Sequence, residues 1–223
     1  MSSLKKNKTL CYNMMKTIVK GKKSMARPRK FDKDLALKAA MHLFWRKGYH
    51  TTSLDDLCEA MHINRSSFYA AYVDKRTLFQ SCMDLYFDGF ISRLPVVAEL
   101  ENPLEVLRAV LIKNMADDVP NVFYGCLLVN SVLEMADVDE DLRHSAQLKW
   151  KHMVEDYSRE VFLRAGLTPD QAQAFSKYFD TVISGITVLD RKHVPRSELR
   201  AIINQTFDFF QLAVSANKQY VPL

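Results

Sequence analysis

Residues 51–79 have the pattern of two short helices joined by a tight turn and followed at once by a third helix. Ser53 is a suitable N-cap, and Asp56 stands three residues later, which gives a variant of the capping box. After a short turn, Asn64 can cap the next helix, which is expected to begin at about Arg65. This pattern is that of a helix-turn-helix, and it points to DNA as a partner.

The helix predicted to begin at Arg65 carries small and polar side chains that suit close approach to a groove. They are Arg65, Ser66, Ser67, Tyr69 and Ala70. A cation, hydroxyls and a phenol are groups that bind phosphates and base edges. Phe68 and Tyr72 are expected to anchor the opposite face of this helix. Lys75 opens a further helix, where it and the free N–H groups can hold a phosphate.

Further residues at fixed spacing carry a resemblance to a known family. They are Ala26-Arg27-Pro28-Arg29, Ala39-Ala40, Leu43-Phe44, Lys47-Gly48-Tyr49, Thr51-Thr52-Ser53, Ser67-Phe68-Tyr69-Ala70-Ala71-Tyr72, Asp74-Lys75 and Leu78-Phe79. With them, the stretch from 27 to about 79 resembles the DNA-binding domain of the TetR/AcrR family of bacterial transcriptional regulators. Two positions depart from the family pattern, because His62 stands where Gly is common and Tyr72 where Phe is frequent. The residues expected to contact DNA are Thr52, Ser53, Arg65, Ser66, Ser67, Tyr69, Ala70 and Lys75.

The charge is distributed unevenly along the chain. Residues 1–80 hold 17 Lys and Arg against 6 Asp and Glu, whereas residues 81–223 hold 14 against 20. A basic N-terminal part attracts the phosphate backbone, and an acidic remainder keeps the rest of the chain away from DNA. Residues 1–30 hold ten Lys and Arg and no acid, for which a solvated charge run is the alternative.

Residues 1–26 are expected to form a basic, disordered tail, with docking along DNA as the alternative. Residues 1–24 could equally be an upstream extension, a cloning artefact or a mis-assigned start. The sequence has no secretory h-region and no run of about eighteen apolar residues, so we expect neither export nor a membrane partner. The four cysteines show no CxxC spacing, which favours reduced thiols and a cytoplasmic location.

Beyond residue 80 the periodicity is helical throughout, and no stretch alternates long enough to propose a strand. The helices are expected over 74–93, 103–117, 126–135, 139–165 and 169–191, with a last helix capped by Ser197 and ending at about residue 216. Asn102 and Thr168 are the expected caps before Pro103 and Pro169. We therefore predict an all-α protein with a tail at 1–26, a helix-turn-helix domain at 27–79 and a helical bundle at 80–223.

Three weaker motifs are similar to segments of a subset of the family's C-terminal domains. They are residues 125–131, Ile183-Ser184-Gly185-Ile186 and Leu199-Arg200-Ala201-Ile202. The resemblance implies a ligand-binding and dimerisation domain, whose last two helices pack against their copies in a homodimer as a four-helix bundle. The expected interface residues are Tyr178, Val182, Gly185, Ile186, Ile203, Phe207 and Phe210. The alternative, that such residues fill the core of the single chain, stays open.

Aromatic and methionine residues of the C-terminal domain are expected to line a pocket for an unidentified small hydrophobic or aromatic effector. We assign to it Tyr86, Phe87, Phe90, Met115, Phe123, Cys126, Leu127, Asn130, Trp150, Met153 and Tyr157. Each is also a plausible core residue. Cys126 follows Gly125 at a helix N-terminus, where a thiolate is favoured, so sensing of an electrophile or oxidant is an alternative to effector binding.

No motif of an enzyme, metal site or cofactor site is found: there is no P-loop, no dinucleotide-binding glycine pattern, no G-x-S-x-G and no H-E-x-x-H. His144 and His152 lack acidic or cysteine partners at ligand spacing. We expect no catalysis and no cofactor. The favoured function is a ligand-responsive DNA-binding repressor, and the contrasting one is a helical interaction protein with a basic arm.

Overall fold

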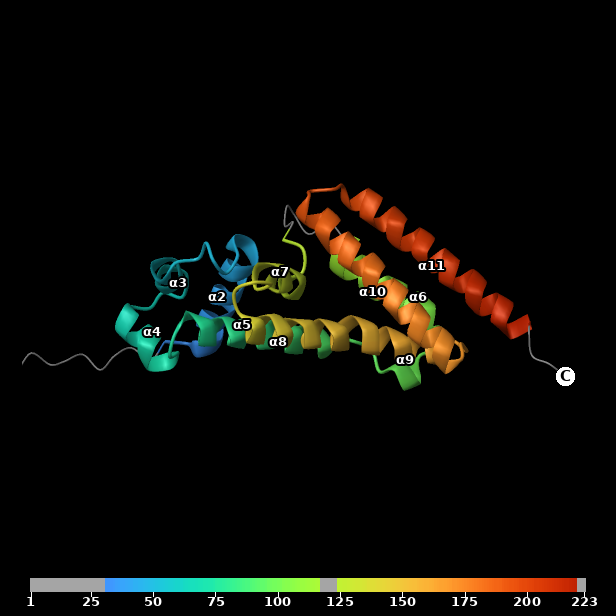
Figure 1. Cartoon of the computed structure of the whole chain (residues 1–223), viewed down its shortest axis with the longest axis horizontal. Coiled ribbons are helices and arrows are strands. Elements are labelled where there is room, and N and C mark those ends of the chain that lie inside the picture. Colours follow the sequence, from blue (N-terminus) through green and yellow to red (C-terminus); the bar gives the residue numbers. More distant parts are fainter. Residues whose placement is uncertain (1–30, 117–123, 220–223) are drawn as a thin grey trace, which may run out of the picture. The chain divides into compact units, whose positions relative to one another are not determined.

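The computed structural model describes residues 31–116 and 124–219, and all regular structure within these two ranges is helical (Figure 1). The all-α prediction is thus confirmed for the part of the chain described. The first four helices are α2 (Lys33–Lys47), α3 (Leu54–Ala60), α4 (Arg65–Ala71) and α5 (Lys75–Ile91). The predicted tail of residues 1–26 and the pocket candidate Phe123 lie outside the described residues.

Polar residues cap α3, α4 and α5 at their expected positions. The Ser53 hydroxyl accepts the backbone N–H of Asp56 at 3.1 Å, and the Asp56 carboxylate accepts the Ser53 N–H at 2.7 Å. This pair is the predicted capping box. Asn64 and Asp74 accept backbone N–H groups of α4 and α5 through their side-chain oxygens, at 2.8 and 2.7 Å. Since these contacts are local, they fix the helix starts from sequence alone.

The turn between α3 and α4 contains a residue in the left-handed region of backbone space. His62 has φ of 53°, which a side chain with a Cβ adopts only at a cost of about 1 to 2 kcal/mol. The departure from glycine noted in the sequence therefore leaves the turn in a glycine-like conformation. His62 therefore has a strained backbone conformation in the folded protein.

Replacing His62 with glycine is therefore expected to stabilise the protein by about 1 kcal/mol, because the strain is relieved at a small entropic cost in the unfolded chain. Urea denaturation of the two proteins measures the difference. The control is His144→Gly within α8 (Glu140–Lys151), where the same change should be destabilising. A His62→Gly protein that is less stable than the parent would contradict the strain.

The remaining helices follow in a second group of elements. After the short η1 (Val97–Glu99) come α6 (Pro103–Leu111) with the π-helical turn η2 (Ile112–Ala116), α7 (Leu127–Glu134), α8, the π-helical turn η3 (His152–Asp156), α9 (Tyr157–Arg164), α10 (Pro169–Arg191) and α11 (Arg196–Gln219). In Figure 1, α5 and α8 run alongside each other from the α2–α4 group to the α9–α11 group. None of the described helices is long and apolar enough to span a bilayer.

Most predicted helix boundaries in this group are close to those observed, with three differences. The helices expected over 103–117 and 139–165 each include a π-helical turn, η2 in the first and η3 in the second. Asn102 stands at the N-cap of α6 without a side-chain cap hydrogen bond, whereas Thr168 forms the expected capping box with Gln171. Ser197 does not cap α11, since that helix begins one residue earlier at Arg196.

A cluster of phenylalanine rings forms the core between α9, α10 and α11. Its rings are Phe162, Phe175, Phe179, Phe207 and Phe210. The closest pair is Phe162 and Phe210, whose centroids are 4.9 Å apart in an edge-to-face arrangement. The cluster contains two residues that the sequence assigned to a dimer interface.

The dimer assignment therefore needs correction at four positions. Ile186, Ile203, Phe207 and Phe210 are all buried inside the single chain, so they are unavailable to a second copy. The cause is that the most regular apolar stripes of α10 and α11 turn towards the chain's own helices. Three candidates keep surface access: Tyr178 and Gly185 are exposed, and Val182 is half-buried.

The boundary predicted between residues 79 and 80 falls within α5, which continues through it without a break. Helix α2 packs on this same helix. Any displacement of α5 therefore reaches both groups of helices.

Candidate nucleic-acid interface and cavity

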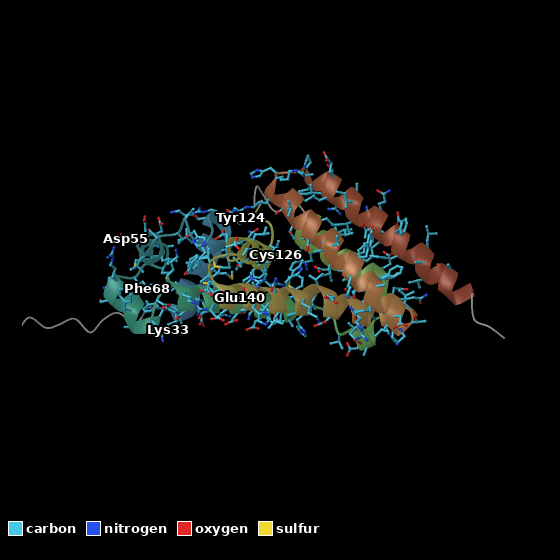
Figure 2. The ribbon with its side chains drawn as sticks, in the orientation of Figure 1. Lys33, Asp55, Phe68, Tyr124, Cys126 and Glu140 are labelled. Carbon is cyan, nitrogen blue, oxygen red and sulfur yellow. The ribbon has the colours of Figure 1, made fainter. Side chains whose placement is uncertain are left out.

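The α3–α4 pair presents the polar face of α4 to solvent and the apolar face to the core. Phe68 is fully buried, while Tyr69 on the neighbouring face is 58% exposed. Figure 2 shows Asp55 of α3 and Phe68 of α4 in this part of the fold. Arg65, Ser66 and Ala70 are exposed and Ser67 is half-buried. Five candidate DNA contacts thus lie on one short helix whose outer face is open.

Arg65 is held by a neighbouring carboxylate. Its Nε and Nη2 donate to Asp55 Oδ1 at 3.0 and 2.9 Å, and Nη2 also reaches Oδ2 at 2.9 Å. The hydrogen bond with Asp55 raises the pKa of the guanidinium. Both groups are well exposed, so water screens the pair and the arginine can exchange partners at little cost.

Two of the candidate serines already form hydrogen bonds at the N-termini of α3 and α4. Ser66 Oγ donates to Asn64 Oδ1 at 2.7 Å, and Ser53 Oγ donates to Asp56 Oδ2 at 2.7 Å. Lys47 Nζ also donates to this carboxylate at 2.6 Å. Hydrogen bonds from Lys47 and then from Ser53 hold the pKa of Asp56 well below its usual range. The Asp56 carboxylate therefore stays ionised down to acidic pH.

Thr52 does not lie on the proposed DNA face. Its side chain is buried, and the hydroxyl donates to the carbonyl of Gly48 at 2.6 Å. Between the end of α2 at Lys47 and the start of α3 at Leu54 the chain must turn back, and this hydrogen bond closes the turn. The prediction of Thr52 as a side-chain contact to DNA is therefore not supported by its geometry, whereas the neighbouring Ser53 is exposed.

Lys75 lies at the N-terminus of α5 with its ammonium over the ring of Tyr49, 4.3 Å from the centroid. Burial lowers the pKa of this ammonium. The position agrees with a cation held beside a helix start, where a phosphate is favoured. Its neighbour Arg76 is tied to Asp139 of the second helix group, with Nε donating at 2.6 Å.

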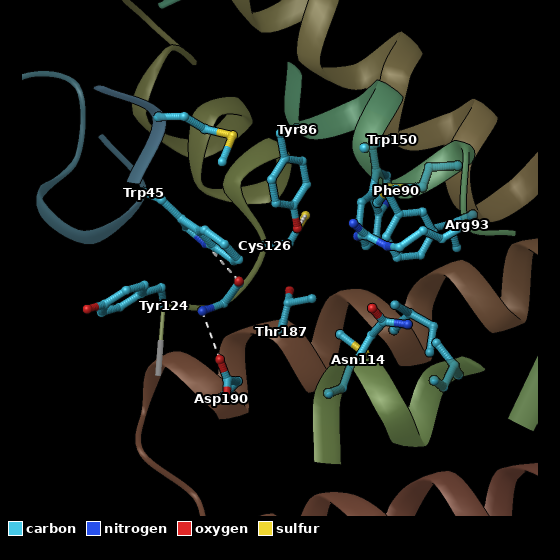
Figure 3. A pocket seen from close by; sticks show the side chains of 18 of the residues that line it. Trp45, Tyr86, Phe90, Arg93, Asn114, Tyr124, Cys126, Trp150, Thr187 and Asp190 are labelled. Atoms are coloured by element: carbon cyan, nitrogen blue, oxygen red, sulfur yellow. Dashed lines mark hydrogen bonds between the residues drawn. The ribbon is translucent and has the colours of Figure 1, made fainter. Parts of the chain in front are cut away.

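A cavity of about 850 Å³ opens between the two groups of helices (Figure 3). Seven of the predicted pocket residues line it: Tyr86, Phe90, Met115, Cys126, Trp150, Met153 and Tyr157. Most of the wall is apolar, and the size and lining are those of a site for a small organic molecule. The sequence therefore predicted the lining residues contributed by α5 and by the continuous helical segment from α8 to α9.

Three predicted pocket residues do not line the cavity. Phe87 turns to the other side of α5, where its ring meets that of His152 at 5.7 Å. Leu127 of α7 is buried in the apolar core of the chain. The amide of Asn130 donates to the carbonyl of Tyr124 at 2.8 Å, which stabilises the segment before α7. Phe87 and Leu127 each stand one residue after a lining residue, and one residue of shift along a helix rotates a side chain by 100°, which explains these two misses.

The wall contributed by α2 and α10 was not predicted from the sequence. From α2 this wall includes Lys38, His42 and Trp45, and from α10 it includes Ile183, Thr187 and Asp190. Residues of α2 had been assigned only to the DNA-binding group. The one available signal was Trp45, a large aromatic residue near the end of a short helix in an otherwise small domain.

A chain of hydrogen bonds joins α2 to α10 across this wall. Trp45 Nε1 donates to the carbonyl of Gly125 at 2.9 Å, and the Gly125 N–H donates to Asp190 Oδ2 at 2.8 Å. The other oxygen of Asp190 forms an ion pair with Arg196, whose Nη1 also donates to the carbonyl of Met115 at 2.8 Å. The chain crosses the cavity wall and ends at the start of α11.

Gly125 is the one position in this chain of bonds where only glycine fits. Its φ is +64°, and a Cβ there would lie 2.9 Å from the backbone oxygen of Thr187. The close approach lets the backbone itself bridge Trp45 and Asp190. The segment 124–126 is thus a fixed part of the wall.

The Cys126 thiol faces the hydroxyl of Tyr86 at 3.5 Å. Burial raises the pKa of Cys126, although the Tyr86 hydroxyl and the N–H groups of α7 oppose the shift. Burial likewise raises the pKa of Tyr86 well above its usual value. A thiol with a raised pKa stays protonated at neutral pH, so the expected activation by the helix N-terminus is outweighed.

The sequence matches known proteins over the helix-turn-helix and beyond it. The family model described as "Bacterial regulatory proteins, tetR family" matches residues 36–82. The HTH-type transcriptional repressor ComR of Escherichia coli (strain K12) is 29% identical over 199 residues, which cover 83% of this chain and 91% of ComR. The HTH-type transcriptional regulator YezE of Bacillus subtilis (strain 168), itself named as uncharacterized, is 32% identical over 147 residues, covering 63% of this chain and 73% of YezE.

The fold matches solved structures over the same range. A cysteine variant of the TetR family transcriptional regulator CifR, in complex with 26-bp double-strand operator DNA, superposes with a TM-score of 0.70 and 28% identity. The match covers 82% of this chain and 98% of that one. The chain therefore belongs to the TetR family, whose members are DNA-binding transcriptional regulators and not enzymes.

Proposed function

We propose that this regulator represses transcription by binding a pseudo-palindromic operator as a homodimer, and that a small effector in the cavity releases it. The observation that carries the proposal is that α2, a helix of the DNA-binding group, forms one wall of the cavity through Trp45. A ligand in this cavity would touch the DNA-binding group directly. Two of the similar proteins, ComR and BdcR of Escherichia coli (strain K12), are named transcriptional repressors, which supports repression over activation of transcription.

DNA reading is assigned to the open face of α4. Arg65 and Ser66 would contact base edges, with Ser67, Tyr69 and Ala70 allowing close approach. Ser53 and Lys75 would bind phosphates, so Lys75 would contribute equally on any sequence. One such helix covers only a few base pairs. Two copies in a dimer would enter successive major grooves about 34 Å apart.

The dimer surface is assigned to the faces of α10 and α11 that the single chain leaves uncovered. On α10 these positions are Tyr178, Thr181, Val182, Gly185 and Val188, and on α11 they are Phe209 and Leu212. Phe209 is 67% exposed and Leu212 is 71% exposed. Nothing lies within 4 Å of a Cβ placed on Gly185, so a partner helix could approach closely there. Apolar side chains grouped on two neighbouring helices are typical of an interface.

Release would follow if the effector favoured a dimer whose two α4 helices are wrongly spaced. Two connections would carry the change: α5, which runs from the DNA-binding group along the cavity, and the Trp45–Gly125–Asp190 chain of hydrogen bonds. Thiol sensing by Cys126 gains no support, because burial keeps the thiol protonated.

Filling the cavity should imitate the effector. Gly89 lines it from α5, and a Cβ there would meet only the Arg93 Nη1, at 4.0 Å, so Gly89→Phe can enter without a backbone clash. We expect this variant to bind operator DNA about 5- to 150-fold more weakly, the range of a typical allosteric coupling. Fluorescence anisotropy with DNA from the upstream region of the regulator's own gene measures the effect.

The matched control is Gly89→Ala, which adds one methyl group in ordinary contact and leaves most of the cavity open. It should keep operator affinity and gain about 0.5 to 1 kcal/mol of stability from helix propensity. Cys126→Ser should leave operator binding unchanged as well. Equal operator affinity of the phenylalanine and alanine variants would remove the cavity from the switch.

A further inference from the structure

The charges around the cavity are unbalanced. Its lining contains the cations Lys38, Arg46, Arg93 and Arg196, and its one carboxylate among the described residues is that of Asp190. This carboxylate is already neutralised, because it pairs with Arg196 and accepts the N–H of Gly125. Among the described residues of the lining, positive charge is therefore in excess, and no further carboxylate of these residues compensates it.

The three other cations of the lining, Lys38, Arg46 and Arg93, lie at exposed positions. Lys38 and Arg46 are eight residues apart on α2, which places them on the same helix face. Within residues 33–116 and 124–216, neither these two nor Arg93 is paired with a carboxylate. Uncompensated cations beside an apolar cavity attract anions from solution and repel cationic ligands.

Arg93 is placed to reach a ligand inside the cavity. It follows the end of α5, and its Nη1 lies 4.0 Å from the Cβ position of Gly89, so the guanidinium folds back over the glycine. The aromatic rings of Phe90 and Trp150 point into the cavity on the same side in Figure 3. A planar cation next to aromatic rings matches a ligand with an apolar body and an anionic head.

We propose that the effector is an organic anion whose apolar, ring-bearing body lies among Tyr86, Phe90 and Trp150 and whose carboxylate-type head binds Arg93. The proposal rests on the proposed function, since it names the chemical class of the molecule that the cavity would take. A carboxylate can accept two parallel hydrogen bonds from a guanidinium. A neutral molecule of the same shape would cover the guanidinium without giving it a partner, which costs affinity.

The test compares two fluorescent probes with the same rings. 8-Anilino-1-naphthalenesulfonate carries one anionic head in place of a carboxylate, and N-phenyl-1-naphthylamine carries none. Trp45 and Trp150, the two tryptophans of the chain, both line the cavity, so energy transfer from tryptophan that is lost on Gly89→Phe reports probe bound inside it. Arg93→Gln should weaken binding of the sulfonate about tenfold and change binding of the neutral probe less than about twofold.

Lys177→Gln is the matched control, since Lys177 is an exposed cation of α10 outside the cavity lining, and it should change neither affinity. If both probes bind and Arg93→Gln affects them equally, the anion proposal is overturned while the cavity stands as a ligand site. If Gly89→Phe does not reduce the energy transfer, or neither probe gives any, the cavity itself fails as a ligand site. That result would overturn the proposed effector binding together with this inference.

Discussion

Replacing Arg196 with leucine is expected to lower the free energy of unfolding by about 3 to 5 kcal/mol, a large effect for one surface-proximal residue. The side chains of Arg196 and Asp190 are only 15% and 11% exposed, so the substitution leaves a carboxylate without its cation in a poorly hydrated place. Asp190 also accepts a hydrogen bond from the N–H of Gly125. The substitution would therefore loosen the cavity wall at 124–126 as well. Urea denaturation gives the size of the loss.

Two variants separate this pair from ordinary ion pairs. Arg143→Leu removes a partner of the exposed Glu140 and should cost less than about 1 kcal/mol. The double variant with leucine at both 190 and 196 removes both charges and should recover much of the stability lost by Arg196→Leu alone. A loss below about 1 kcal/mol for Arg196→Leu would show that the pair does not hold the wall.

The double substitution Phe209→Glu with Leu212→Glu is expected to dissociate the proposed homodimer and to weaken operator binding by about 100-fold or more. Two negative charges would replace two exposed apolar side chains on one face of α11, which the proposed interface would bury against the partner. A monomer engages one half-site, and it loses the gain that comes from linking two binding modules. Light scattering gives the mass, and anisotropy gives the affinity.

Leu148→Glu provides a control of the same chemistry on another surface. Leu148 of α8 is 54% exposed and lies outside the proposed interface, so the variant should remain dimeric and bind operator as the parent does. A dimer that survives the α11 substitutions, or that dissociates with Leu148→Glu, would place the interface elsewhere. Circular dichroism confirms that each variant is folded.

The helix-turn-helix could be predicted almost to the residue because its signals are local. The helix starts are set by the caps Ser53, Asn64 and Asp74, whose side chains each accept a backbone N–H three residues later. Such contacts do not depend on the tertiary structure around them. The turn at His62 is the exception, because its backbone conformation does not follow from the local residue preference. There the surrounding helices impose the left-handed conformation on a residue that disfavours it.

The cavity and the dimer surface were predictable only in part because both depend on long-range packing. Periodicity predicts which face of a helix is apolar. It does not identify which helix of the same chain, or which partner, covers that face. The most regular stripes of α10 and α11, with Ile186, Ile203 and Phe207, were therefore assigned to the wrong neighbour. The contribution of Trp45 depends on Gly125, eighty residues away, and no sequence pattern joins the two.

We propose that α4 reads a specific two-fold symmetric site as part of a dimer. The most direct measurement is the affinity of the full chain for DNA fragments from upstream of its own gene, compared at physiological salt with the same fragments scrambled within the proposed half-sites. We predict a footprint with two half-sites about one helical turn or a multiple of it apart, and an affinity about 10³-fold or more above that for scrambled DNA. Equal affinity for both DNAs, with no symmetric footprint on any fragment, would contradict the account.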